Sequence, residues 1–146
     1  MSEHVPIKIL LVEDNEGDAI LTKLAFEKAN IPVHVTIVID GVEAMEYLRG
    51  KGEFSNAEKP DIILMDINMP RMSGKEALIE IKKDEDLKVI PVIMLTSSEA
   101  YMDILESYKH YANAYIVKPV TNEKFVEAAQ TIEDFWLKIS KLPGTT

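Results

Sequence analysis

The sequence contains no cysteine, so neither a disulfide nor a thiolate metal site can form. It also lacks any apolar run close to the roughly 20 residues that a membrane-spanning helix needs. The first residues, Met-Ser-Glu-His-Val-Pro, have none of the charged and apolar regions of a secretory signal peptide. Together these absences favour a cytoplasmic protein.

Positive charge is scarce as well. The chain has 16 lysines and arginines against 25 aspartates and glutamates, which gives a net charge of −9. A nucleic-acid surface needs clustered basic side chains to contact phosphates, so this composition argues against such a partner. With 146 residues, of which 47% are hydrophobic, we expect one globular domain over 1–146. Its core should span about 6–130, and a last helix should extend to about 141.

The most informative stretch is the apolar run from Ile62 to Met65, which leads directly into Asp66 and then a turn with Pro70. A short apolar run between polar and turn residues is typical of a strand buried on both faces. Asp66 would end this strand, and open α/β sheets place their sites at the carboxyl ends of strands. Asp66 is therefore the first candidate functional residue.

Strand and helix patterns alternate along the chain. The predicted strands are 7–12, 33–39, 62–66, 91–95 and 114–117, and helices are predicted at 16–29, from 41, after 73, at 99–111 and at 121–141. This alternation predicts an α/β protein with a flavodoxin-like (βα)5 doubly wound parallel sheet. The first, third and fourth strands are the most apolar, whereas His34 and Thr36 interrupt the second, as suits an edge strand. The expected strand order, counted along the chain, is 2-1-3-4-5.

Local signals define parts of these helices. Ser73 is the predicted N-cap of the third helix, because Glu76 follows three residues later as in a capping box. The predicted inward-facing residues are Ala77, Leu78 and Ile81 in this helix and Val42, Met45 and Leu48 in the helix before it. Residues 50–59 are predicted to form a loop, because breaker residues interrupt any periodic pattern there.

Acidic side chains should converge at one edge of this sheet. Glu13 and Asp14 follow the first strand, and Asp66 ends its neighbour, the third. A carboxylate can accept a phosphoryl group to form an acyl phosphate, but both reactants are anionic. Carboxylate oxygens are suited to Mg²⁺, or to Mn²⁺, and either ion offsets this repulsion. The sequence therefore predicts a cation-dependent phosphoryl acceptor at Asp66, with Glu13 and Asp14 beside it.

Two further strand ends supply complementary groups. Thr96 follows the fourth strand and offers a hydroxyl that can donate a hydrogen bond to a phosphoryl oxygen. Lys118 follows the fifth strand and offers a positive charge. Each residue alone would be an ordinary loop residue, but the joint pattern favours phosphoryl transfer, which depends on positioning and charge neutralisation.

These blocks resemble the receiver domain of two-component response regulators over about residues 6–130. The matching blocks, in order, are Glu13-Asp14, Asp66 within Asp-Ile-Asn-Met-Pro-Arg-Met-Ser-Gly, Thr96-Ser97, Tyr115 and Lys118-Pro119. The resemblance implies that Asp66 takes a phosphoryl group from the phosphohistidine of a sensor histidine kinase. It also implies that Asp14, Asp66 and the backbone carbonyl of Asn68 bind Mg²⁺, with Glu13 contributing through water.

The resemblance further implies how the protein signals. Thr96 would move toward the phosphoryl group and Tyr115 would turn inward, which changes the face formed by the fourth helix, fifth strand and fifth helix. Such a protein is a phosphoacceptor with Mg²⁺-dependent self-phosphorylation and autodephosphorylation rather than a conventional enzyme. Its output passes through protein contact or phosphorelay.

A narrower resemblance concerns the loop 50–59 and the ending 132–143. Both are similar to those of stand-alone regulators that work with bacterial phytochrome kinases, which implies a phytochrome-type kinase as partner. Phe135 and Trp136 are adjacent, so they point about 100° apart on a helix and cannot both face one core. Either this helix has a wide apolar face, or the two rings, with Tyr101 and Tyr108, contact a partner or a second copy in a homodimer.

Two other functions share some of these features. A phosphatase of the haloacid dehalogenase type also uses Asp, Thr, Lys and Mg²⁺, but it needs an acidic side chain where this chain has Asn68. A flavodoxin-like cofactor protein needs small residues and free amides after the first strand to bind phosphate. The acidic stretch 13–18 would repel phosphate instead.

Overall fold

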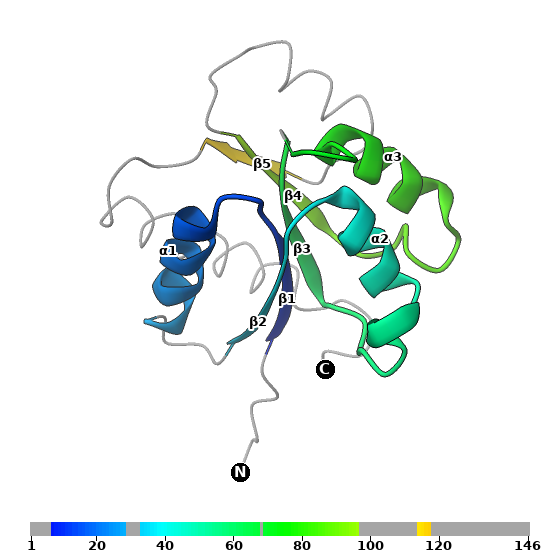
Figure 1. The fold of residues 1–146 in the computed structure, drawn as a ribbon, viewed down its shortest axis with the longest axis horizontal. Helices are drawn as coiled ribbons and strands as arrows, with labels where there is room; N and C mark the ends of the chain where they lie inside the picture. Colours follow the sequence, from blue (N-terminus) through cyan, green and yellow to red (C-terminus); the bar gives the residue numbers. More distant parts are fainter. Residues whose placement is uncertain (1–6, 29–32, 68, 97–113, 118–146) are drawn as a thin grey trace.

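The structure is a computed structural model that describes residues 7–28, 33–67, 69–96 and 114–117, with only the backbone described at Thr96 and 114–117 (Figure 1). The strands are β1 (Ile7–Val12), β2 (Val33–Val38), β3 (Ile62–Asp66), β4 (Val92–Thr96) and β5 (Ala114–Val117). The helices are α1 (Glu16–Glu27), α2 (Gly41–Leu48) and α3 (Gly74–Lys83), with a 3-10 turn, η1, at Gly52–Phe54. The helices predicted at 99–111 and 121–141 lie outside the described residues.

All five strands form one parallel sheet in the order β2-β1-β3-β4-β5, which confirms the predicted topology. The register pairs Val12 with Met65 and Asp66 with Leu95. Because parallel strands point the same way, their carboxyl ends meet at a single edge of the sheet. The ends of β1 and β3, which carry the acidic residues, are therefore neighbours.

The sheet separates two apolar layers. Figure 1 shows α1 on one face of the sheet and α2 and α3 on the other. Alternate residues of β1 serve the two layers: Leu10 and Val12 belong to the α2 and α3 side, whereas Ile9 and Leu11 belong to the α1 side. Every residue of β3 is buried. Burying a large aliphatic side chain stabilises the fold by about 1.5–3 kcal/mol, so β3 is firmly held up to Asp66.

Side-chain caps fix where the helices begin. Asn15 caps α1 by accepting from the Asp18 N–H, and Asp40 caps α2 by accepting from the Glu43 N–H. Ser73 and Glu76 form the predicted capping box at α3. Each such cap satisfies a backbone donor that the helix itself leaves unpaired. The Asn15 and Asp40 caps come shortly after β1 and β2, whereas Ser73 comes at the end of the longer loop that follows β3.

The structure corrects several details of the sequence interpretation. β2 ends at Val38 instead of residue 39, and Ile39 is half exposed. In α2 the buried residues include Ala44, and the predicted inner residue Val42 is only partly buried. Ala44 is fully buried in the apolar layer that also contains residues of α3. Within the described part of the chain, no helix is long and apolar enough to cross a membrane.

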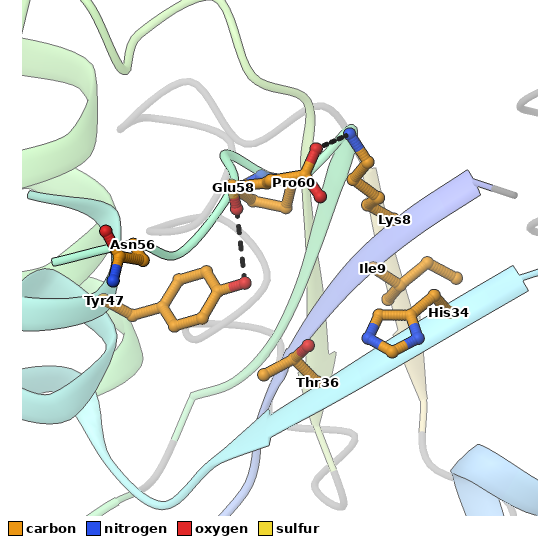
Figure 2. A pocket seen from close by; sticks show the side chains of 8 residues that line it. All are labelled: Lys8, Ile9, His34, Thr36, Tyr47, Asn56, Glu58 and Pro60. Atoms are coloured by element: carbon orange, nitrogen blue, oxygen red, sulfur yellow. Dashed lines mark hydrogen bonds and ion pairs between the residues drawn. The ribbon is translucent and has the colours of Figure 1, made fainter. Parts of the chain in front are cut away.

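The loop between α2 and β3 folds back onto the start of the sheet (Figure 2). The Tyr47 hydroxyl donates to the Glu58 carbonyl at 3.2 Å, and Lys8 Nζ lies 2.7 Å from a carboxylate oxygen of Glu58. Together with His34 and Pro60, these side chains line a hollow of about 490 Å³. The hollow lies beside the first residues of β1 and β2, whereas the acidic residues follow the strands' carboxyl ends.

Gly74 brings the start of α3 directly against the end of β3. Its N–H donates to the Ile67 carbonyl at 2.8 Å. A Cβ added here would collide with the backbone carbonyl oxygen of Asp66 and would lie 2.9 Å from Ile67 Cα. Only glycine permits this close approach. The contact of Gly74 with the backbone at Asp66 and Ile67 therefore fixes the start of α3 relative to Asp66.

We expect Gly74→Ala to lower the free energy of unfolding by about 3 kcal/mol, because a methyl group here must displace backbone rather than a flexible side chain. Gly17→Ala in α1 is the matched control, since its Cβ would meet only the Asn15 Oδ1 at 3.4 Å. Urea denaturation of both variants measures the difference. Equal stabilities of the two variants would contradict the packing described for Gly74.

Candidate functional site

Glu13, Asp14 and Asp66 form a compact acidic cluster at the carboxyl edge of the sheet. One carboxylate oxygen from each residue lies within 4.8 Å of the other two. Glu13 and Asp66 are buried, with 2% and 6% of their surface exposed, and Asp14 is exposed. The cluster is therefore closed on its inner side and open to solvent at Asp14.

Backbone pairing places Glu13 beyond the end of β1. Its N–H donates to the Val38 carbonyl at 2.9 Å, which continues the pairing of β1 with β2. Its carboxylate accepts from the Asn15 N–H at 3.1 Å. Because Asn15 is also the N-cap of α1, this hydrogen bond fixes the acidic turn between the strand and the helix.

The position of Asp66 depends on the pairing of β3 with β4. Asp66 lies opposite Leu95, and the N–H of Ile67 donates to the Leu95 carbonyl at 3.0 Å. The side chain thus projects from a strand whose backbone is held on both sides, by β1 and by β4. A side chain on a rigid strand end is suited to a reaction that depends on positioning.

The donor set of the cluster fits a hard divalent cation. Mg²⁺ and Mn²⁺ prefer carboxylate and carbonyl oxygens together with water. Like charges this close repel one another, and a cation among them offsets the repulsion. The exposed side of the cluster leaves access for water and for a phosphoryl group.

Comparison with known proteins assigns the family. Residues 9–130 match the response regulator receiver domain. The chain belongs to this family. A receiver domain takes part in two-component signalling and is phosphorylated on an aspartate, so this chain is a phosphoacceptor rather than a conventional enzyme. The family decides against the phosphatase and flavodoxin-like cofactor alternatives.

Similar receiver domains include regulators of phytochrome systems. The chain is 39% identical over 139 residues to the response regulator Rcp1 of Synechocystis sp., and the match covers 95% of either protein. The crystal structure of the phosphorylated cyanobacterial phytochrome response regulator RcpA has a TM-score of 0.89 and 44% identity, covering 96% of this chain and all of that one. The Mn²⁺-bound form of Rcp1 has a TM-score of 0.86 and 39% identity, covering 95% of this chain and all of that one.

The structure describes the other predicted site residues of this receiver domain only in part. The backbone of Thr96 ends β4 and pairs with Val117 of β5, and Tyr115 pairs with Met94. Thr96 therefore lies at the same edge of the sheet as Asp66. The remaining predicted residues lie outside the described part of the chain: Asn68, Lys118, Tyr101, Tyr108, Phe135 and Trp136.

One ion pair near the site was not predicted from the sequence. Arg71, in the loop between β3 and α3, donates from Nε to Asp40 Oδ2 at 2.6 Å and from Nη2 to Oδ1 at 3.1 Å. The two residues are 31 positions apart, and no periodic pattern links them. The sequence offered only the residue types as a signal for this pair. Arg71 is a basic residue in the loop after Asp66, and Asp40 is an acidic residue at the start of a helix.

The environment of Asp40 stabilises its charged form. Burial alone would raise the pKa of Asp40, but the hydrogen bond from Arg71 opposes this effect. The charge of Arg71 and the backbone N–H groups of Glu43 and Val42 also lower the pKa of Asp40. Together these effects outweigh burial, so the pKa lies below its ordinary value. A carboxyl group with a lowered folded-state pKa stabilises the fold while it is ionised.

The Asp40 contribution to the free energy of unfolding should depend on pH. It should be complete above about pH 5, because an unfolded aspartate titrates near pH 4. It should be lost as the pH falls through the lower folded-state pKa. Asp40→Asn keeps a side-chain acceptor for the α2 cap but cannot titrate, so the stability of this variant should fall less steeply in acid than that of the wild type.

Urea denaturation between pH 7 and pH 3 tests this expectation. Glu85→Gln is the control, because Glu85 pairs with Lys88 in an exposed ion pair at 2.9 Å, and such pairs contribute little. Parallel stability curves for the wild type and Asp40→Asn would contradict the assignment.

Proposed function

We propose that Asp66 is the residue that accepts the phosphoryl group. Asp14, Asp66 and the backbone carbonyl of Asn68 would hold Mg²⁺ or Mn²⁺, and Glu13 would contribute through water. The observation that carries this proposal is the acidic cluster, whose ligand oxygens lie within 4.8 Å of one another at the end of β3. The manganese reported for Rcp1 supports the choice of ion.

In the proposed reaction, a carboxylate oxygen of Asp66 attacks the phosphorus atom of a phosphohistidine. The new P–O bond gives an acyl phosphate, the P–N bond breaks, and its electron pair remains on the imidazole nitrogen of the donor. A divalent cation, when bound, supplies positive charge that offsets the charge of the anionic oxygens. Burial of Asp66 and Glu13 limits water on the inner side of the site.

Thr96 and Lys118 would stabilise the phosphoryl oxygens, through a hydroxyl and an ammonium group respectively. Thr96 and Tyr115 would then change position together and alter the surface formed by residues 99–111, β5 and residues 121–141. The same site would allow Mg²⁺-dependent self-phosphorylation from small donors and autodephosphorylation. The position of Thr96 at the same edge as Asp66 supports these roles.

The phosphoryl donor would be a sensor histidine kinase of the phytochrome type, acting in the cytoplasm. This proposal rests on relatives such as RcpA, described as a phytochrome response regulator, which cover nearly all of this chain. The chain 1–146 would act as a single receiver domain and pass its signal to a protein partner, by relay, or to a second copy in a homodimer. Tyr101, Tyr108, Phe135 and Trp136 are the proposed contact residues.

We expect labelled phosphohistidine on a phytochrome-type kinase to transfer its phosphoryl group to the wild-type protein and not to Asp66→Asn. The asparagine amide has nearly the same size as the aspartate carboxylate, but it does not attack the phosphorus atom. Asp86→Asn is the matched control, because Asp86 is an exposed aspartate in the turn after α3. Autoradiography of the separated proteins measures the label.

Retention of label on Asp66→Asn would show that another residue is the acceptor. If an unrelated histidine kinase transferred its phosphoryl group faster than the phytochrome-type kinase, the proposed partner would be wrong. The assignment of Asp66 as the acceptor would still stand.

A further inference from the structure

The loop between β3 and α3 contains a tight, strained reversal. The N–H of Met72 donates to the Pro70 carbonyl at 2.8 Å, which closes a three-residue γ-turn around Arg71. Arg71 has φ 64°, and it is the only non-glycine residue with positive φ in the described ranges. A bulky side chain in this region costs free energy, and such a conformation persists only where the surroundings impose it.

The N-terminus of α2 imposes this conformation. Arg71 makes both of its side-chain hydrogen bonds to Asp40, whose carboxylate is only 3% exposed. In the next residues, the Gly41 N–H donates to the Met72 carbonyl at 3.1 Å. Asp40 is itself immobilised, because its carboxylate also accepts from the Glu43 N–H at 2.8 Å. The loop is thus tied at two consecutive residues to a rigid helix end.

Close packing reinforces the same contact. A Cβ on Gly41 would lie 2.5 Å from the Met72 carbonyl oxygen, so glycine is required at this approach. Met69 and Met72 pack against the apolar layer that lies beneath α2 and α3. Their flexible thioether side chains can fill that layer in more than one way, so they do not by themselves fix the course of the backbone.

This loop begins and ends at the acidic cluster. It leaves from Asp66 and returns to Gly74, which packs against the Asp66 carbonyl. The Asp40–Arg71 pair holds the middle of the loop, outside the cluster. Groups that orient metal ligands from outside the ligand set affect metal affinity although they do not touch the metal.

We propose that the Asp40–Arg71 ion pair is a positioning device for the cation site. It holds the β3–α3 loop in the shape that lets the acidic cluster bind a divalent cation tightly. Arg71 is a positioning residue here, because it acts through the loop backbone. The inference rests on the proposed function of the cluster, and it adds an element of α2 to a site otherwise formed by strand ends and their loops.

Mn²⁺ titration tests this inference, with the signal of free Mn²⁺ followed by electron paramagnetic resonance. We expect Arg71→Gln and Asp40→Asn each to weaken Mn²⁺ binding by about tenfold, the lower end of the range for groups that orient metal ligands. The double variant should bind about as weakly as either single variant, because both remove the same ion pair. Arg71→Lys keeps the charge without the two-pronged geometry, so its affinity should be intermediate.

A second comparison separates positioning from stability. Glycine adopts φ 64° without strain, so Arg71→Gly should melt at the same temperature as Arg71→Gln or higher, yet bind Mn²⁺ no more tightly. Arg49→Gln is the matched control, because it removes an arginine–carboxylate pair, Arg49 with Asp84 at 3.9 Å, from the other end of α2. This control should bind Mn²⁺ like the wild type.

The outcomes distinguish the inference from the proposed function. Wild-type affinity in Arg71→Gln and Asp40→Asn would overturn the inference alone. Recovery of wild-type affinity in Arg71→Gly would also overturn it, because relief of strain and not the ion pair would then set the affinity. Failure of the wild type itself to bind Mn²⁺ would instead overturn the proposed cation site.

Discussion

Repulsion among three carboxylates at one edge of the sheet is the constraint on which the rest of the site depends. Glu13, Asp14 and Asp66 come from two strands far apart in sequence, and hydrogen bonding between neighbouring strands brings them together. The apolar layers on both faces of β3 stabilise this arrangement, so the fold provides the free energy that keeps like charges close. A cluster held in this way favours the binding of a divalent cation. The positive charge of that cation would in turn favour the approach of an anionic phosphoryl group.

At this edge of the sheet, a rigid strand is followed by a strained loop. β3 is buried throughout, whereas the loop that follows Asp66 contains a left-handed arginine and a γ-turn. Strain at this position is tolerated because α2 holds the loop through Asp40 and Gly41. A receiver domain needs an accurately placed acceptor. A buried strand, followed by a loop that the start of α2 holds in place, meets this need.

The sequence predicted the parts of this structure that depend on local or periodic patterns. The apolar run into Asp66, the polar interruptions of β2 and the Ser73–Glu76 capping box all appear where expected, and so does the strand order. The acidic cluster was predictable because parallel strands must end at a common edge. The Asp40–Arg71 pair was not, since it depends on how a loop and a helix end meet in space. Helical spacing alone does not decide burial: in α1, Ile20 and Leu24 fit the spacing of the apolar residues but are nearly half exposed.

On the function proposed above, the acidic cluster accepts a phosphoryl group only together with a divalent cation. The most direct test uses a histidine kinase that is phosphorylated beforehand and freed of metal, mixed with this protein in a chelator and then with increasing Mg²⁺. We expect no transfer in the chelator and a transfer rate that rises with Mg²⁺ until one site is saturated. Transfer at the same rate with and without Mg²⁺ would show that the cluster does not need a cation.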